Sequence, residues 1–187
     1  MTKWFTADWH LGHANIIEYC RRPFADVSVM DNAIIDRHNS VVGDDDDVYM
    51  IGDVTLRGIQ AIREYIGRLN GSIKVVPGSH DWGWLTGYRE SIKPVSRSGH
   101  DLVVLPPLYS LEINVFKQYP LVIVLCHYAL RVWDRSHYNS LHLYGHSHGI
   151  LGVLPGTDRS MDVGVDTNNF YPYSLEEIKE TLCQNQL

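Results

Sequence analysis

Aspartate and histidine residues recur at short spacings in five separated segments of the chain. The segments are Asp8-Trp9-His10, Gly52-Asp53, Gly78-Ser79-His80-Asp81, His127, and Gly145-His146-Ser147-His148. Each directly follows a strand-like apolar run, and residues two apart in extended backbone point to the same side. A single histidine after a strand is more often a hydrogen-bonded residue than a ligand, so the prediction depends on the whole set. Together the segments predict a metal site at the ends of several strands.

The mixture of ligand types indicates which metals and which chemistry to expect. Carboxylate oxygens and imidazole nitrogens in this proportion favour manganese, iron, zinc or nickel over calcium or magnesium alone, and no cysteine-rich set suggests a structural zinc. A central carboxylate such as Asp53 is suited to bridge two ions about 3.5 to 4 Å apart, the spacing used to activate water against a phosphoryl group. We therefore expect two divalent transition-metal ions, with manganese favoured.

These motifs together resemble those of a known enzyme family. The series DxH, GD, GSHD, H and GHxH resembles the calcineurin-like metallophosphoesterases, and ADWHLGHANII with CRRPF is similar to their small bacterial and phage branch. The resemblance covers about residues 4 to 170. It implies an α/β fold in which two sheets form a sandwich flanked by helices, with a dinuclear site at the strand ends.

The resemblance also implies a role for each motif residue. The first metal would be held by Asp8, His10 and His148, Asp53 would bridge, and the second metal would be held by His127 and His146. His80 would contact the phosphate and stabilise or protonate the leaving group. Ser79 stands where the family has an asparagine ligand of the second metal, which leaves the occupancy of that site open. Leu56 replaces an aspartate that many members have, which removes a common partner of His80.

Other polar residues near the motifs have two explanations each. His13 either reaches the substrate phosphate or bonds to the backbone at the start of a helix. Arg57 and Arg131 follow predicted site loops and are candidates to bind the ester oxygens, although solvated arginines are the more common outcome. For Asp81, a structural role in holding the loop is favoured over catalysis.

The function expected from these residues is hydrolysis of a phosphate ester. The branch resemblance favours phosphodiesters, and a chain without an obvious cap insertion favours a nucleotide-like or short oligonucleotide substrate. The alternative is a weakly active or non-catalytic regulatory protein that keeps the fold and binds metal or phosphate. The sequence does not predict the oligomeric state.

Hydrophobic periodicity predicts the elements that position these residues. In the first half we expect strands over 3–8, 48–53 and 72–80 and helices over 14–22, 28–41 and 59–69. This alternation predicts a parallel sheet with right-handed crossovers. In the second half we expect strands over 102–115, 120–128, 141–148 and 161–166 with mixed or antiparallel pairing. A last helix should run from Ser174 to about Gln184, with Glu177 completing a capping box.

Composition narrows the class of protein. A chain of 187 residues suits a single domain over 1–187. The net charge of -6 argues against a long basic groove for duplex nucleic acid. No apolar run approaches the roughly 20 residues of a membrane helix, and no secretory signal is visible, so we expect a cytoplasmic protein without a membrane partner.

Overall fold

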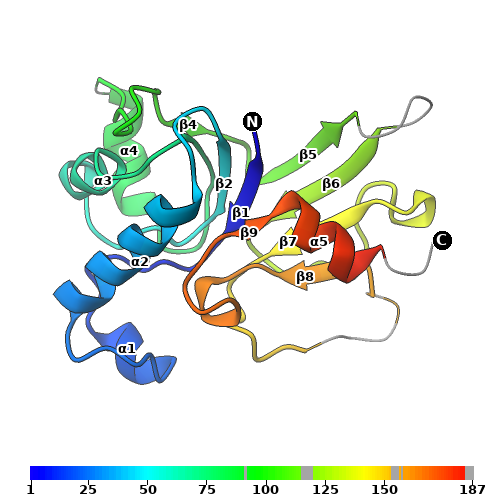
Figure 1. Cartoon of the computed structure of the whole chain (residues 1–187), viewed down its shortest axis with the longest axis horizontal. Helices are drawn as coiled ribbons and strands as arrows, with labels where there is room; N and C mark the ends of the chain where they lie inside the picture. Colours follow the sequence, from blue (N-terminus) through cyan, green and yellow to red (C-terminus); the bar gives the residue numbers. More distant parts are fainter. Residues whose placement is uncertain (91, 115–119, 153–155, 157, 184–187) are drawn as a thin grey trace.

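A computed structural model describes residues 1–90, 92–114, 120–152, 156 and 158–183. In this structure two sheets pack face to face, and helices cover the outer face of the first sheet (Figure 1). This is the two-sheet α/β sandwich that the motif resemblance implies.

The first sheet contains the strands of the first half of the chain. Its order is β4-β3-β2-β1-β9, where the strands are β1 (Lys3–Thr6), β2 (Asp47–Ile51), β3 (Ser72–Val76), β4 (Val103–Val104) and β9 (Tyr173–Ser174). Strands β1, β2 and β3 pair in parallel, as predicted; β4, which was expected in the second half, also pairs in parallel with β3, and β9 joins β1 antiparallel at the edge. Parallel pairing places the carboxyl ends of β1, β2 and β3 at one edge, which is where the candidate ligands follow.

The second sheet contains the strands of the second half. Its order is β5-β6-β7-β8, where the strands are β5 (Leu108–Ile113), β6 (Leu121–Cys126), β7 (Leu141–Tyr144) and β8 (Ser160–Asp162). Strands β5 and β6 pair antiparallel, whereas β6–β7 and β7–β8 pair in parallel. The predicted mixed sheet is therefore confirmed.

The helices in the described residues are α1 (Asn15–Tyr19), α2 (Val27–Val41), α3 (Ile59–Ile66), α4 (Trp82–Glu90) and α5 (Leu175–Leu182), with 3-10 turns at Ser136–Tyr138 and Val165–Thr167. Helices α1 and α3 each end three residues before the end expected from the sequence. Asp26 caps α2 by accepting the Val29 N–H at 2.9 Å. The capping box of Ser174 and Glu177 is formed at the start of α5, as predicted. The expected end of that helix near Gln184 lies outside the described residues.

Two apolar clusters explain why the sheets stack. Alternate residues of each strand face opposite sides, so Phe5 and Tyr49 join Ile123 and Leu143 between the sheets. The other face of the first sheet packs against α2 and α3 through residues such as Met50. The site loops therefore project from a rigid framework that is buried on both sides of the first sheet.

Four other parts of the described fold also differ from the sequence expectation. The segment 102–115 forms two strands in different sheets, because Pro106 and Pro107 lack an N–H and interrupt strand pairing; Val115 itself lies outside the described residues. The segment 161–166 leaves β8 after Asp162 and forms a 3-10 turn. Helix α4 and strand β9 were not predicted.

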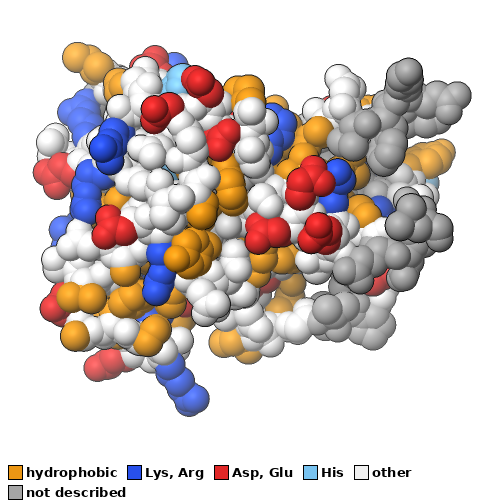
Figure 2. Space-filling view, viewed as in Figure 1, with side chains coloured by type: hydrophobic (Ala, Val, Ile, Leu, Met, Phe, Trp, Pro, Cys, Tyr) orange, Lys and Arg blue, Asp and Glu red, His pale blue; other side chains and the backbone are white. Residues whose placement is uncertain are grey.

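The molecular surface carries both signs of charge. On the face shown in Figure 2, basic side chains lie mainly over the helical half, whereas acidic side chains are spread over the helical half and around the position of α5. None of the helices in the described part of the chain is long and apolar enough to cross a bilayer.

Candidate metal centre

The five predicted segments meet at one edge of the sandwich. Backbone hydrogen bonds join loops from both sheets: the Asp8 N–H donates to the Gly52 carbonyl at 3.0 Å, and the Gly145 N–H donates to the His127 carbonyl at 3.1 Å. Across the two sheets, the His146 N–H donates to Asp8 Oδ2 at 2.8 Å. Segments far apart in the sequence are therefore fixed to one another through their main chains.

Many of the candidate ligands have an unusual backbone conformation. Positive φ angles between 47° and 65° are adopted by Asp8, His10, Asp53, His146 and His148. This left-handed region is uncommon for residues other than glycine and costs on the order of 1 kcal/mol or more per residue. The turns aim these side chains away from the strands and toward one another.

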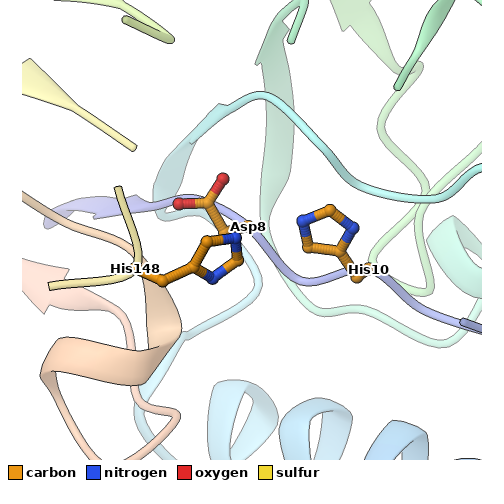
Figure 3. A group of neighbouring side chains, drawn as sticks. All are labelled: Asp8, His10 and His148. Carbon is orange, nitrogen blue, oxygen red and sulfur yellow. The ribbon is translucent and has the colours of Figure 1, made fainter. Parts of the chain in front are cut away.

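Asp8, His10 and His148 form the first group of candidate ligands. One ligand atom from each residue lies within 4.8 Å of the others. Asp8 and His10 are buried and His148 is partly buried. Figure 3 shows the three side chains converging on one space from two loops that are distant in the sequence. This spacing allows all three atoms to bind one ion.

Asp53, His127 and His146 form the second group, again within 4.8 Å of one another. Asp53 connects the two groups, because its Oδ2 atom lies 3.3 Å from His127 Nε2 and 3.7 Å from His10 Nε2. Such distances separate neighbouring ligands of one ion when metal–ligand bonds are about 2.1 Å long. The carboxylate of Asp53 thus has the position expected of a bridge.

Buried nitrogen atoms without partners support a metal in these groups. Among the described residues, Nδ1 and Nε2 of His10 and Nε2 of His127 are buried and form no hydrogen bond. A buried polar atom without a partner costs about 1–3 kcal/mol, and coordination would remove that cost. His127 Nδ1 lies 2.9 Å from the Ile51 carbonyl, which assigns its hydrogen to Nδ1 and leaves Nε2 free to coordinate.

The ionisable groups of the centre have strongly shifted pKa values. Burial raises the pKa of Asp8 to about 7, against the opposing effect of His148. Burial lowers the pKa of His10 to about 3. Burial also lowers the pKa of His127, but the negative charge of the neighbouring Asp53 carboxylate outweighs it and raises that pKa to about 9. Clustered shifts of this kind are common at functional sites.

Glycines allow the loops to approach closely. A Cβ atom on Gly52, whose φ is +84°, would lie 2.5 Å from both Gly78 Cα and His127 Nδ1. A Cβ atom on Gly145 would lie 2.6 Å from Ala7 Cβ. Only glycine fits at these positions without moving the site loops.

Ser79 and His80 lie directly beside Asp53. The Ser79 hydroxyl donates to Asp53 Oδ2 at 3.0 Å, and the His80 N–H donates to Asp53 Oδ1 at 2.8 Å. The His80 side chain is exposed, and its ring centroid lies 5.5 Å from that of His10. His80 therefore faces the ligand groups from the solvent side.

Of the remaining predicted residues, two lie beside the candidate ligand groups and one lies elsewhere. The ring of His13 lies 5.7 Å from that of His10, and its Nδ1 atom is buried without a hydrogen bond among the described residues. Arg57 donates to the Gly12 carbonyl at 3.2 Å and so lies beside the first loop. Arg131 instead lines a separate cavity of about 300 Å³ with Trp133, His137 and Arg159.

The structure adds supporting residues that sequence reasoning did not identify. Asp166 lies 2.7 Å from His148 Nδ1, and Arg22 pairs with Asp166. Asp162 accepts the Ser147 hydroxyl at 2.6 Å and the Gly149 N–H at 2.8 Å. Asp162 ends strand β8 and Asp166 lies in the 3-10 turn that follows, but no histidine accompanies either, so the motif spacing did not select them.

Comparison with known proteins identifies relatives whose function is unknown. No family model matches the chain. A protein of Methanocaldococcus jannaschii, described as uncharacterized protein MJ1445, is 30% identical over 179 residues, which is 92% of this chain and 86% of that protein. The gene 66 protein of Mycobacterium phage L5 is 30% identical over 103 residues, 54% of this chain and 45% of that protein.

A solved structure from Aquifex aeolicus has the same fold. The Aquifex aeolicus protein of unknown function AQ665 superimposes with a TM-score of 0.70 and 20% identity, covering 96% of this chain and 98% of that one. At this identity the likeness concerns the fold alone. Because the M. jannaschii relative matches along almost the whole chain, the chain belongs to the MJ1445 family.

Proposed function

We propose that this protein is a metal-dependent phosphoesterase of the calcineurin-like type. The observation that carries the proposal is the position of Asp53, which belongs to the second ligand group and lies beside His10 of the first. Within each group of Asp and His residues the ligand atoms lie within 4.8 Å of one another. The spacing of the two groups suits a pair of divalent transition metals, with manganese favoured.

The chain's own residues have separate tasks in this mechanism. Two bound cations would supply positive charge to the phosphate and polarise a water molecule for attack on phosphorus. His80, exposed and beside His10, is placed to contact the phosphate and to donate a proton to the leaving oxygen. His13, whose ring lies 5.7 Å from that of His10, is the second candidate to contact a nonbridging oxygen.

We favour a phosphodiester with a nucleotide-like group as the substrate. Trp82 directly follows the His80 loop and is 60% exposed, and Tyr128 follows His127 and is 49% exposed. Exposed aromatic rings beside a phosphate site suit stacking with a base. The mixed charges on the surface in Figure 2 favour a short substrate over a long duplex.

A second candidate is a binding protein that keeps the fold and one metal without turnover. The observation that favours it is Ser79, whose hydroxyl donates to Asp53 where the resemblance places an amide ligand. The exposed position of His146 also leaves the second group open to solvent. Such a protein would bind metal and phosphate but release no product.

Hydrolysis of bis-p-nitrophenyl phosphate with added manganese tests the proposal. We expect turnover that a chelator abolishes, faster than on the monoester p-nitrophenyl phosphate. Asp53→Asn should remove most activity and lower bound metal while the protein remains folded, whereas Asp36→Asn, on the exposed side of α2, should change neither. Metal binding without turnover would favour the second candidate, and full activity in Asp53→Asn would contradict the bridging role.

A further inference from the structure

The arginine of the CRRPF motif is buried beside the first ligand group. The Arg22 side chain is 0% exposed. Its Nε atom donates to Asp166 Oδ1 and its Nη2 atom donates to Asp166 Oδ2, both at 2.8 Å. This two-point pairing fixes the orientation of the Arg22 guanidinium relative to the Asp166 carboxylate. Taking such a charge out of water is costly, and the pairing with Asp166 offsets that cost.

The same guanidinium also holds the loop that follows β1. Arg22 Nη2 donates to the Asp8 carbonyl at 2.7 Å, and Nη1 donates to the Trp9 carbonyl at 2.9 Å. These carbonyls belong to the turn that carries Asp8 and His10. Arg22 thus binds the backbone of one ligand loop directly.

Asp166 connects this arginine to the other ligand loop. Its Oδ2 atom lies 2.7 Å from Nδ1 of His148. A carboxylate in this position keeps the histidine hydrogen on Nδ1 and leaves Nε2 unprotonated for coordination. Arg22 and Asp166 therefore link the loop that carries Asp8 and His10 to the ring of His148 through one set of hydrogen bonds.

We propose that Arg22 and Asp166 are positioning residues that assemble the first metal group before any ion binds. The proposal rests on the metal centre of the proposed function, but concerns ion affinity and not ester chemistry. Asp166 could also be viewed as a ligand, because its oxygen lies within 4.8 Å of ligand atoms of Cys20 and His148. Both of its oxygens already face the Arg22 cation, which would repel a metal ion there, so the positioning role is favoured.

Manganese binding to the full chain tests this role without any substrate. Asp166→Asn keeps the shape but can present an N–H to His148, which favours the wrong tautomer. We expect its affinity for the tighter manganese ion to fall 10- to 100-fold, as is usual when such a supporting residue is replaced. The lysine of Arg22→Lys cannot reach all four oxygen acceptors and should weaken the binding of the same ion to a smaller extent. A manganese titration, monitored through the electron paramagnetic resonance signal of the free ion, measures the affinity of both variants.

Matched controls and a second measurement separate positioning from general damage. Asp36→Asn and Arg21→Lys make the same exchanges at exposed residues and should bind manganese like the wild type. Nitrogen-15 NMR of the metal-free protein should show His148 protonated at Nδ1 in the wild type and in both controls. In Asp166→Asn the Nδ1-protonated form should be lost. If Asp166→Asn fails to fold, the same measurements on Arg22→Lys decide.

The outcomes distinguish this proposal from the proposed function. Wild-type affinity in both variants, or an unchanged His148 tautomer in Asp166→Asn, would overturn the positioning role whatever the activity. If the wild type binds two ions, loses affinity in the variants and hydrolyses no ester, the positioning role stands and the phosphoesterase proposal fails. If the wild type binds no manganese or other divalent metal, both fail.

Discussion

At the residue scale, Ser79 offers a hydroxyl where the motif resemblance expects an amide. The hydroxyl donates to Asp53, and a neutral hydroxyl is a weaker metal ligand than an amide oxygen. We predict that activity rises with manganese well beyond one equivalent and that Ser79→Asn lowers the concentration needed for half-maximal activity. Metal titration of hydrolysis for both proteins measures this. An equal or higher requirement in Ser79→Asn would place Ser79 away from the second ion.

A substitution at His80 distinguishes a role in catalysis from a role in metal binding. Its side chain is exposed and belongs to neither group of candidate ligands. We predict that His80→Ala keeps both ions and loses about 10²- to 10⁴-fold in rate, the range for an acid or base that assists a leaving group. Metal analysis and initial rates are the two measurements, and His137→Ala, at an exposed site in another loop, is the control. Loss of a metal ion would instead make His80 a ligand.

The motif spacing predicted which residues meet at one edge, and the family resemblance divided them between two groups, but neither indicated the residues that support them. DxH and HxH place two side chains on one side of an extended backbone, and that local rule needs no tertiary information. The partner of Arg22 is 144 residues away, and the hydrogen bond between Asp166 and His148 depends on how β8 leaves its sheet. Such contacts follow from the assembled fold, so no sequence pattern indicates them.

At the element scale, the parallel half of the fold was predictable because its strands and helices alternate with clear periodicity. Helix α4 was not, since its sequence WGWLTGYRE contains two glycines, each costing up to about 1 kcal/mol in a helix. A side-chain contact offsets part of this cost: Asp81, which precedes the helix, accepts the Trp84 indole N–H at 2.9 Å. Two prolines likewise separate β4 from β5 and send the chain to the second sheet.

Asp81 holds three site elements together and gives a prediction at this scale. It is fully buried and accepts the N–H groups of Asp53 at 2.8 Å, Val54 at 3.0 Å and Gly78 at 2.8 Å. Asp81→Ala leaves these donors buried without partners, so we predict a loss of about 3–5 kcal/mol in the free energy of unfolding. Urea denaturation measures it.

The matched change Asp36→Ala, on the exposed side of α2, should alter the unfolding free energy by less than about 0.5 kcal/mol. A loss of rate in Asp81→Ala with unchanged stability would make Asp81 a participant in the chemistry. The structural role of Asp81 would then be wrong.

At the scale of the whole molecule, the metal centre joins loops from both sheets. Ions that bind the folded chain alone stabilise it by about 2.7 kcal/mol at a concentration 100 times the dissociation constant. We predict that saturating manganese raises the Tm by about 5–10 °C and that a chelator reverses the increase. Differential scanning calorimetry measures the shift, with magnesium as the comparison ion. An unchanged Tm with every divalent transition metal would contradict the centre.

The overall architecture was predicted less directly than the site. Alternation of strands and helices indicated a parallel sheet, but the sandwich came from the motif resemblance. Nothing local indicates that β9 pairs with β1, because Tyr173 and Ser174 form only a short strand at the edge. Sheet order depends on which faces are apolar after folding, and a pattern along one strand does not reveal its neighbour.

The left-handed backbone at Asp8, His10, Asp53, His146 and His148 implies a conflict between the thermal stability of the metal-free protein and its activity. Glycine at any of these positions would relax the main chain and remove a side chain that the centre requires. A library of variants selected only for heat resistance without metal should therefore drift toward glycine there and lose function. Selection for turnover should keep these residues and favour compensating changes elsewhere in the framework.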